Sequence, residues 1–276
     1  MLYTASINSG SNGNCYYVGN DHEAVFIDAG VSCRETEKRM RTLGLSLHKI
    51  KAVFISHEHI DHIKGVERLS AKYQLPVYIT PRTHQNSHLS IQTHLLKGFA
   101  TNDKVIIGSL TITAFTKAHD AADPCSFMVS GSNVNVGIFT DIGVPCDKLG
   151  LHFGQCHAAF LEANYDAQML ETGRYPYHLK NRIRGGNGHL SNDQALDVFR
   201  QHKPEFMSHL FLAHLSQDNN CPEKAKALFN DHAGNTRVCI ASRHHASEVF
   251  TIYDHQQTPV IRPVERFTSI QQSLPF

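Results

Sequence analysis

Residues 56–65 have the sequence Ser-His-Glu-His-Ile-Asp-His-Ile-Lys-Gly, with three histidines and one aspartate inside six positions. They directly follow the apolar run Ala52–Ile55, which predicts a strand with His57 and His59 at its carboxyl end. The chain is rich in histidine, with 20 among 276 residues, yet a chance match to this pattern is expected only about 0.005 times along it. The stretch therefore indicates a metal site.

The composition restricts the classes of partner and compartment. The formal net charge of +1 provides no overall field for coating a polyanion, so any nucleic-acid contact has to be local. Seven scattered cysteines with no Cys-x-x-Cys pair favour reduced thiols over a disulfide framework. Because the sequence shows no basic leader and no apolar stretch of about 18 to 20 residues, we expect a soluble, cytoplasmic protein without a membrane span. It does not indicate an oligomeric state.

Short apolar runs bounded by Gly, Asn or Pro predict two groups of strands. The first group comprises Leu2–Ile7, Cys15–Val18, Ala24–Ile27, Ala52–Ile55 and Val77–Ile79. The second comprises Val105–Ile107, Leu110–Phe115, Phe127–Val129, Val134–Phe139, Ala158–Leu161, Phe206–Leu212 and Val238–Ile240.

Helices are predicted around both groups, at Cys33–Leu43, Val66–Tyr73, Ala195–Arg200 and Glu223–Asn230. Ser191 with Gln194 matches the capping box, and Pro222 suits a first helical position. Since no linker separates the two groups, we expect one domain over residues 1–276, of the α/β (α+β) class, with two sheets packed face to face in four αββα layers.

Further ligands are needed, because two histidines leave a metal under-coordinated. The adjacent Asp61 and His62 can turn away from His57 and His59 and begin a second site. Candidates to complete the pair follow predicted strands, namely His119, Asp141 and His214. Each has a structural alternative: a lone histidine is usually hydrogen-bonded in the fold, and Asp141 could cap a turn. Asp28, likewise, could simply end its strand. His209 rivals His214, but an odd separation makes the two face opposite ways on a regular strand, and His214, at the end of the run, is preferred.

The chain resembles the metallo-β-lactamase superfamily in a set of motifs that occur in the same order. These are Asp28 after a strand, the His-x-His-x-Asp-His loop, His119, Thr140-Asp141-Ile142-Gly143 and His214. Within it, SGSNGN, HDAADP, LEANYD, GHLSN and HLSQDNN are similar to the YycJ/WalJ branch, which is related to ribonuclease Z. The resemblance implies a four-layered αββα metallo-β-lactamase sandwich and metal-dependent DNA 5′-exonuclease activity.

The same resemblance implies a role for each site residue. The first metal takes the residues matching His57, His59 and His119, and the second takes those matching Asp61, His62 and His214. Asp141 bridges the two metals, and Asp28 orients the metal loop from behind the ligands. His189 lies where the ribonuclease Z group has a histidine near the scissile phosphate. Asp61 and His189 are therefore the expected catalytic residues.

Differences from particular members of the superfamily restrict the activities expected of this chain. No cysteine stands at the second-site position that binds zinc in several β-lactamases. His59 is retained where flavodiiron oxidoreductases have Glu, which disfavours redox di-iron chemistry. There is no inserted nuclease cap domain and no Gly/Pro-rich arm of the kind with which ribonuclease Z grips tRNA, which disfavours tRNA processing.

These donors support a dinuclear metal-dependent phosphodiesterase acting on nucleic acid, and the resemblance favours a 5′-to-3′ DNA exonuclease. Two cations can share a water, and attack by the metal-bridging hydroxide would cleave the phosphodiester. His189 or a metal-bound water could protonate the leaving oxygen. Nitrogen and oxygen donors fit Zn, Mn or Fe, and the resemblance favours Zn or Mn. The alternatives are a small-molecule hydrolase of thioesters or lactams, an RNA-processing nuclease, and a metal-binding regulator without turnover.

Substrate contacts are less defined. Residues 8–14 could present amides to a phosphate or form an ordinary hairpin turn. Lys180, Arg182 and Arg184 could touch a nucleic-acid backbone or form a solvated face, and nearby tyrosines could stack on bases or pack in the fold. The candidate substrate-binding residues are Ser11, Asn14, Ser191, Asn192 and Ser216.

Overall fold

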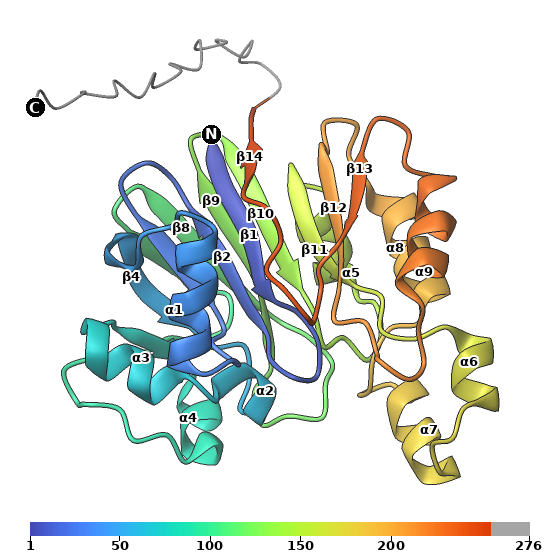
Figure 1. The fold of residues 1–276 in the computed structure, drawn as a ribbon, viewed down its shortest axis with the longest axis horizontal. Coiled ribbons are helices and arrows are strands. Elements are labelled where there is room, and N and C mark those ends of the chain that lie inside the picture. The colour runs from blue at the N-terminus through green and yellow to red at the C-terminus, as the bar shows by residue number, and fades with distance from the viewer. Residues whose placement is uncertain (255–276) are drawn as a thin grey trace, which may run out of the picture.

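Two seven-stranded sheets pack face to face in the computed structural model, which describes residues 1–254 (Figure 1). In order across the first sheet, the strands are β14 (Phe250–Ile252), β1 (Leu2–Asn8), β2 (Cys15–Gly19), β3 (Ala24–Ile27), β4 (Ile50–Phe54), β5 (Val77–Ile79) and β6 (Leu96–Gly98). The second sheet runs β13 (Arg237–Ile240), β12 (His209–Ala213), β11 (Ala158–Glu162), β10 (Val134–Phe139), β9 (Cys125–Gly131), β8 (Leu110–Thr116) and β7 (Lys104–Ile107). The remainder of the predicted domain, residues 255–276, lies outside the described part.

Helices form the outer layers. The first sheet is covered by α1 (Cys33–Thr42), α3 (Val66–Tyr73) and α4 (Pro81–Ser87), and the second by α5 (Asp147–Phe153), α8 (Asn192–His202) and α9 (Pro222–Asn230) (Figure 1). A short 3₁₀ helix, η1 (Leu47–Lys49), precedes β4, while α2 (Ile60–Ile63), α6 (Ala167–Thr172) and α7 (Tyr177–Arg184) lie toward one end of the sandwich. The predicted αββα architecture is confirmed. Among residues 1–254, no helix is long and apolar enough to cross a membrane.

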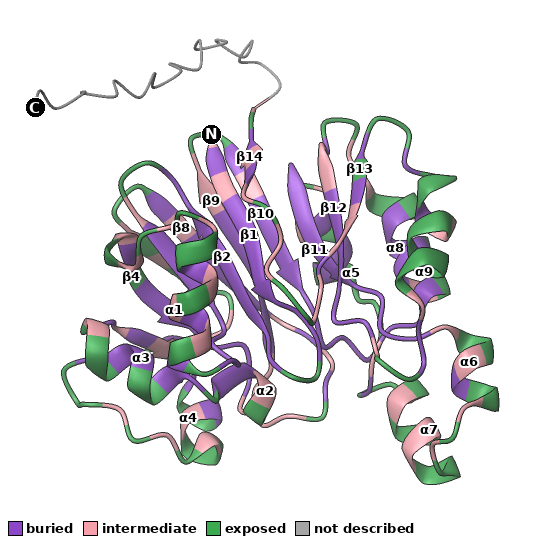
Figure 2. Ribbon diagram, viewed as in Figure 1, coloured by how far each residue is buried: buried purple, intermediate pink, exposed green. Residues whose placement is uncertain are grey.

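The core lies between the sheets and beneath the helices, where the strands are buried and the outer helix faces are exposed (Figure 2). Phe160 and Phe211 stack across neighbouring strands with ring centroids 4.4 Å apart, and Phe54 meets Phe127 edge to face at 5.9 Å. Burying each phenyl ring contributes about 1.5–3 kcal/mol. This apolar interior gives the strand ends a rigid support.

Most predicted elements are confirmed, with boundaries within a few residues. Ser191 and Gln194 form the predicted capping box at the start of α8, and Pro222 opens α9. The prediction was wrong at the start of β12, which begins at His209; the ring of Phe206 instead packs 4.7 Å from that of His157. The short strands β6 and β14 and the helices η1, α2 and α4 to α7 were missed. All seven cysteines are unpaired, as expected.

Parallel pairing positions the strand ends. Strands β3 to β6 are parallel to one another, as are β10 to β13. The carboxyl ends of parallel strands meet at one edge of a sheet, which is where open α/β sheets place their sites. Residues that follow β3, β4, β10 and β12 are thereby brought toward one edge of the sandwich.

Candidate metal centre

The predicted metal loop joins a strand end to a short helix. His57 follows β4, and His59 is the N-terminal cap of α2, which carries Asp61 and His62. These two were expected on a turning loop, and the structure places them on a helical turn instead. The carbonyl of Asp61 accepts a hydrogen bond from the backbone N–H of Asn14, and a Cβ added at Gly30 would lie only 1.7 Å from that carbonyl oxygen. A glycine is therefore required where the backbone passes α2.

The first predicted subsite is a cluster of three imidazoles. One ring nitrogen from each of His57, His59 and His119 lies within 4.8 Å of the others. His57 Nε2 is 3.0 Å from His59 Nδ1, and the ring centroids of His57 and His119 are 4.9 Å apart. Neutral imidazole nitrogens at this spacing suit a divalent cation.

The second predicted subsite contains a carboxylate and two imidazoles. Asp61 Oδ2 is 3.6 Å from Nε2 of His62 and 3.6 Å from Nε2 of His214. The alternative His209 lies at the opposite end of β12, half-buried, with its ring 5.9 Å from that of Phe211. The structure therefore brings His214 and not His209 into the cluster.

Asp141 lies between the two subsites. Its Oδ2 is 3.3 Å from His62 Nε2, and its Oδ1 is 4.0 Å from His119 Nε2. Asp141 and His214 adopt positive φ angles of 56° and 54°, and Asp28 one of 61°. This left-handed conformation is unfavourable for residues other than glycine and is concentrated at functional sites. The backbone turns sharply at these strand ends, and the side chains point into the centre.

The donors fit divalent metal ions. Three of the imidazoles have Nδ1 within hydrogen-bond distance of an acceptor. Nδ1 of His62 lies 2.7 Å from the Asp28 carboxylate, and Nδ1 of His119 lies 3.1 Å from the Gly188 carbonyl. Nδ1 of His214 lies 2.9 Å from the Glu162 carboxylate. The opposite nitrogens of His119 and His214 are buried and have no hydrogen-bond partner among residues 1–254. Leaving a buried polar atom unpaired costs free energy, and a metal ion in each subsite would satisfy the nitrogen that lies there. We therefore find that these side chains suit divalent cations.

Asp28 lies behind the residues that are predicted to bind metal. It is fully buried, and its carboxylate accepts hydrogen bonds from the backbone and hydroxyl of Ser56, both at 2.8 Å. The same carboxylate holds His62 Nδ1 at 2.7 Å. Asp28 thus aligns the strand end and one imidazole together.

Glu162 was missed by the sequence analysis. It ends β11, is fully buried, and its Oε1 lies 2.8 Å from His189 Nδ1 and 2.9 Å from His214 Nδ1. Its Oε2 accepts hydrogen bonds from the backbone of Ile142 and Leu190. The sequence did contain a signal for it, because Glu162 directly follows the predicted strand Ala158–Leu161. Asp28 and Asp141 follow their predicted strands in the same way. Glu162 links predicted ligand His214 to predicted catalytic residue His189.

The electrostatic environment differs between the subsites. Burial lowers the pKa of His57 well below its usual value and that of His119 to about 4, so both imidazoles are neutral. Burial alone would also lower the pKa of His62, but the carboxylates of Asp141 and Asp28 raise it to about 10. Burial would raise the pKa of Asp141, but the charges of His214 and His62 hold it well below its usual value. Burial thus favours neutral imidazoles at His57 and His119 in the first subsite, whereas carboxylates favour a charged imidazole at His62 in the second.

The predicted substrate contacts do not all lie at a surface. Asn14 is fully buried, and its side-chain amide donates a hydrogen bond to Asp61 Oδ2 at 3.2 Å. Ser191 caps α8, and Asn192 is buried and hydrogen-bonded to Asn220. These placements favour positioning roles for Asn14, Ser191 and Asn192 over direct contact with a substrate. Ser11 is exposed and Ser216 is half-buried, so only these two are accessible from solvent.

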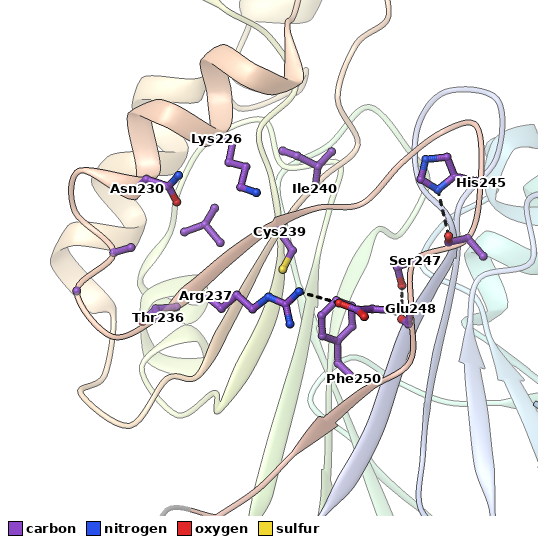
Figure 3. A pocket seen from close by; sticks show the side chains of 14 residues that line it. Lys226, Asn230, Thr236, Arg237, Cys239, Ile240, His245, Ser247, Glu248 and Phe250 are labelled. Carbon is purple, nitrogen blue, oxygen red and sulfur yellow. Dashed lines mark hydrogen bonds and ion pairs between the residues drawn. The ribbon is translucent and has the colours of Figure 1, made fainter. Parts of the chain in front are cut away.

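An open groove of about 670 Å³ lies elsewhere, between α9, β13 and the segment leading into β14 (Figure 3). Arg237 pairs with Glu248 at 2.8 Å on its wall, and the guanidinium carbon lies 5.3 Å from the centre of the Phe250 ring. None of the predicted site residues lines this groove. This groove is therefore separate from the predicted active site, despite its large volume.

Comparison with known proteins identifies the family of this chain. A β-lactamase superfamily domain matches residues 23–214. Exodeoxyribonuclease YycJ of Bacillus anthracis is 35% identical over 228 residues, covering 82% of this chain and 86% of that protein. Exodeoxyribonuclease WalJ of Streptococcus pneumoniae serotype 2 is 30% identical over 225 residues, covering 79% of this chain and 82% of that protein. The crystal structure of the metallo-β-lactamase fold protein YhfI from Bacillus subtilis superimposes with a TM-score of 0.68 at 18% identity, over 89% of this chain and 98% of that one, which is a likeness of fold.

Proposed function

The chain belongs to the metallo-β-lactamase superfamily and is a metal-dependent hydrolase, and on that premise we propose that it is a DNA exonuclease working from 5′ ends. The observation that carries the proposal is the joining of two ligand groups through Asp141, with His189 beside them. Similarity to YycJ and WalJ over most of both chains supports nucleic acid as the substrate. We also propose a cytoplasmic location, in keeping with the seven unpaired cysteines.

We propose that His57, His59 and His119 hold one divalent cation, that Asp61, His62 and His214 hold a second, and that Asp141 contacts both. When bound, the pair supplies a nucleophilic water of lowered pKa and positive charge for the phosphoryl oxygens. The donor set suits Zn or Mn, and Fe also has suitable chemistry. Asp28 and Glu162 keep the imidazoles of His62 and His214 oriented toward the centre.

His189 is proposed to donate a proton to the leaving sugar oxygen. Glu162 Oε1 holds its Nδ1 at 2.8 Å, which leaves Nε2 as the ring nitrogen available to substrate. The His189 side chain is 22% exposed and lies with ring centroids 5.4 Å from His119 and 5.2 Å from His214. It therefore lies beside both proposed subsites while remaining accessible to a nucleic-acid strand.

Helix α7 offers a surface for the rest of the strand. None of its residues is buried, Lys180, Arg182 and Arg184 occur along it, and Tyr177 at its start is 72% exposed. Arg182 Nη2 is 2.6 Å from Asp120 Oδ2, and the other oxygen of Asp120 is 3.4 Å from His119 Nε2. We therefore propose that this basic helix contacts the phosphate backbone of a strand whose end lies at the metal centre.

A panel of substrates with purified, metal-loaded protein tests this function. We expect end-labelled DNA to be shortened from its 5′ end in the presence of Mn²⁺ or Zn²⁺ and to remain intact with chelator. RNA and a thioester, each with and without chelator, cover the two alternatives of an RNA-processing nuclease and a small-molecule hydrolase. Intact DNA alongside chelator-sensitive hydrolysis of the thioester would contradict the proposed function.

A further inference from the structure

His59 differs from the other imidazoles of the proposed metal centre in the nitrogen that it turns inward. The other four hold Nδ1 against a hydroxyl, a carboxylate or a backbone carbonyl, which leaves Nε2 for a cation. In His57, for example, Nδ1 lies 2.9 Å from the hydroxyl of Ser56. In His59 it is Nδ1 that faces inward, 3.0 Å from His57 Nε2. A neutral imidazole that binds a cation through Nδ1 has its proton on Nε2, so His59 needs a hydrogen-bond acceptor there.

Asp120 presents a carboxylate oxygen to that nitrogen. Its Oδ1 is 4.0 Å from His59 Nε2, which is about 1 Å longer than an ordinary N–H···O hydrogen bond. The side chain of His59 is 31% exposed, so its ring has room to turn toward Asp120. A carboxylate on the outer nitrogen of a metal-binding histidine fixes the orientation of the ring and raises its basicity. Asp120 is thus placed to do for His59 what Asp28 does for His62.

Arg182 holds one side of the Asp120 carboxylate and leaves the other side for the imidazoles. Its Nε lies 2.7 Å and its Nη2 2.6 Å from the same oxygen, Oδ2. The remaining oxygen, Oδ1, faces Nε2 of His59 and lies 3.4 Å from Nε2 of His119. Two charge-assisted contacts from a rigid guanidinium restrict the rotation of a carboxylate. Arg182 thereby keeps Oδ1 directed toward the first proposed subsite.

The segment that carries Asp120 is attached on both sides. The backbone N–H of Asp120 donates a hydrogen bond of 3.0 Å to the carbonyl of Asn187, in the turn that follows α7. Two residues later, the N–H of Ala122 donates one of 2.7 Å to Glu58 Oε1. Glu58 stands between His57 and His59 in the metal loop. The short segment 120–122 therefore connects the metal loop of the first sheet to the end of the basic helix.

A second ion pair on α7 provides a comparison. Arg184 Nη1 is 2.8 Å from Glu171 Oε2, with the Glu171 side chain 65% exposed, and this pair joins α6 to α7. Exposed ion pairs contribute little to stability, and such a pair needs no further role. The Asp120 pair differs, because its carboxylate also faces two proposed metal ligands.

We propose that Asp120 is a positioning residue for His59, and that Arg182 extends this link from the first metal subsite to the basic helix α7. The inference rests on the metal centre of the proposed function and adds to it a residue outside the assigned ligands. Arg182 is 63% exposed, so it can meet a phosphate while it holds Asp120. One carboxylate would then be shared by the helix that contacts the strand and by the subsite that contacts the metal.

The zinc affinity of the first subsite tests this role without any substrate. The background is Asp61→Ala, which is expected to hold metal in the first subsite only. In competition with a chelator, adding Asp120→Ala should weaken zinc binding about 10–100-fold, the usual loss when such a partner is removed. Asp120→Asn keeps an acceptor oxygen and should recover part of that loss. Glu171→Gln is the matched control, since it removes the other carboxylate paired with an arginine of α7, and it should bind zinc like the background.

A signal from His59 itself separates positioning from a general weakening of the fold. In the zinc-loaded protein with Asp61 intact, NMR of labelled histidines should show an Nε2–H of His59, assigned by its absence in His59→Gln. An N–H on a ring that is 31% exposed exchanges rapidly with water unless an acceptor holds it. The signal should therefore be absent in Asp120→Ala and present in Glu171→Gln.

Unchanged zinc affinity in Asp120→Ala, or a His59 Nε2–H that persists in that variant, would overturn the inference and leave the nuclease intact. An equal loss of affinity in Glu171→Gln would also overturn it, because the effect would then belong to α7 as a whole. Zinc binding that depends on Asp120 in a protein that cleaves no nucleic acid would overturn the proposed function alone.

Discussion

The two sheets contribute to the metal centre in different ways. The first sheet supplies four of the proposed ligands from six consecutive positions, His57 to His62, on one loop and one short helix. The second supplies His119, Asp141 and His214 from three separate strand ends, together with Glu162 and His189. One half of the centre is local in sequence, and the other half depends on the packing of a whole sheet.

The two sheets also differ in what keeps their proposed ligands aligned. The loop needs only a few neighbours to hold it, chiefly Asp28 and the backbone at Gly30. The second sheet must keep β10, β11 and β12 in register, so that Asp141, Glu162 and His214 lie side by side. A change at Asp141 should therefore affect both subsites, while a change at a single ligand of the loop should affect one.

The largest effect is expected for Asp141→Asn. This residue contacts both subsites, so losing its charge weakens both metals and should lower turnover by roughly 10³-fold or more. Metal content by elemental analysis and cleavage of DNA are the measurements, with circular dichroism to show that the fold is retained. Two metals per chain with near-normal turnover would contradict the bridging position.

Asp61→Ala should abolish most turnover but empty only the second subsite. It removes a carboxylate that lies 3.6 Å from both His62 and His214, and we expect a loss of roughly 10²–10³-fold with about one metal retained. Side-by-side metal counts for Asp61→Ala and Asp141→Asn test the contrast between the sheets. Near-full activity in Asp61→Ala would refute its assignment as a ligand.

His189→Ala should slow cleavage without releasing metal. A positioned general acid contributes about 10²–10⁴-fold, and the lower end is expected because solvent reaches the half-buried side chain. The measurement is single-turnover cleavage together with metal content. Loss of metal in this variant would move His189 from the acid role into the ligand set.

Glu162→Gln should produce a smaller loss, about 10–100-fold, because it alters the partners of His189 and His214 without removing a proposed ligand. Both the rate and the metal affinity should fall, in contrast to His189→Ala, where only the rate changes. Glu171→Gln is a suitable control, since Glu171 is exposed and pairs with Arg184. Unchanged metal affinity in Glu162→Gln would show that its contact with His214 is unimportant.

Arg182→Gln should have the smallest effect. The side chain is 63% exposed, so its phosphate contact should be worth only a few-fold at low salt and less at high salt. Comparing KM for DNA at two ionic strengths measures this, with Arg237→Gln as an exposed control. An increase in activity would instead mean that the Arg182–Asp120 pair restrains substrate entry.

Much of the fold was predictable because its signals are local. The apolar runs for β3, β5 and β10 and the capping box at Ser191 are complete within a few residues, and the structure has them at the expected positions. Strands β6 and β14 are only three residues long and were missed, since their pairing comes from neighbouring strands and not from their composition. Helix α7 was read as a basic stretch but not as a helix, because none of its residues packs in the core.

By itself, the sequence determined the residue types of the centre, the loop that brings four of them together, and the alternation of strands and helices that produces two covered sheets. Only the tertiary structure decided that Asn14 is buried against Asp61 and that Glu162 joins His189 to His214. The physical reason is that a strand end acquires its neighbours through the register of parallel strands and the packing of one sheet on another. Those contacts join residues far apart in the chain, and no local pattern records them.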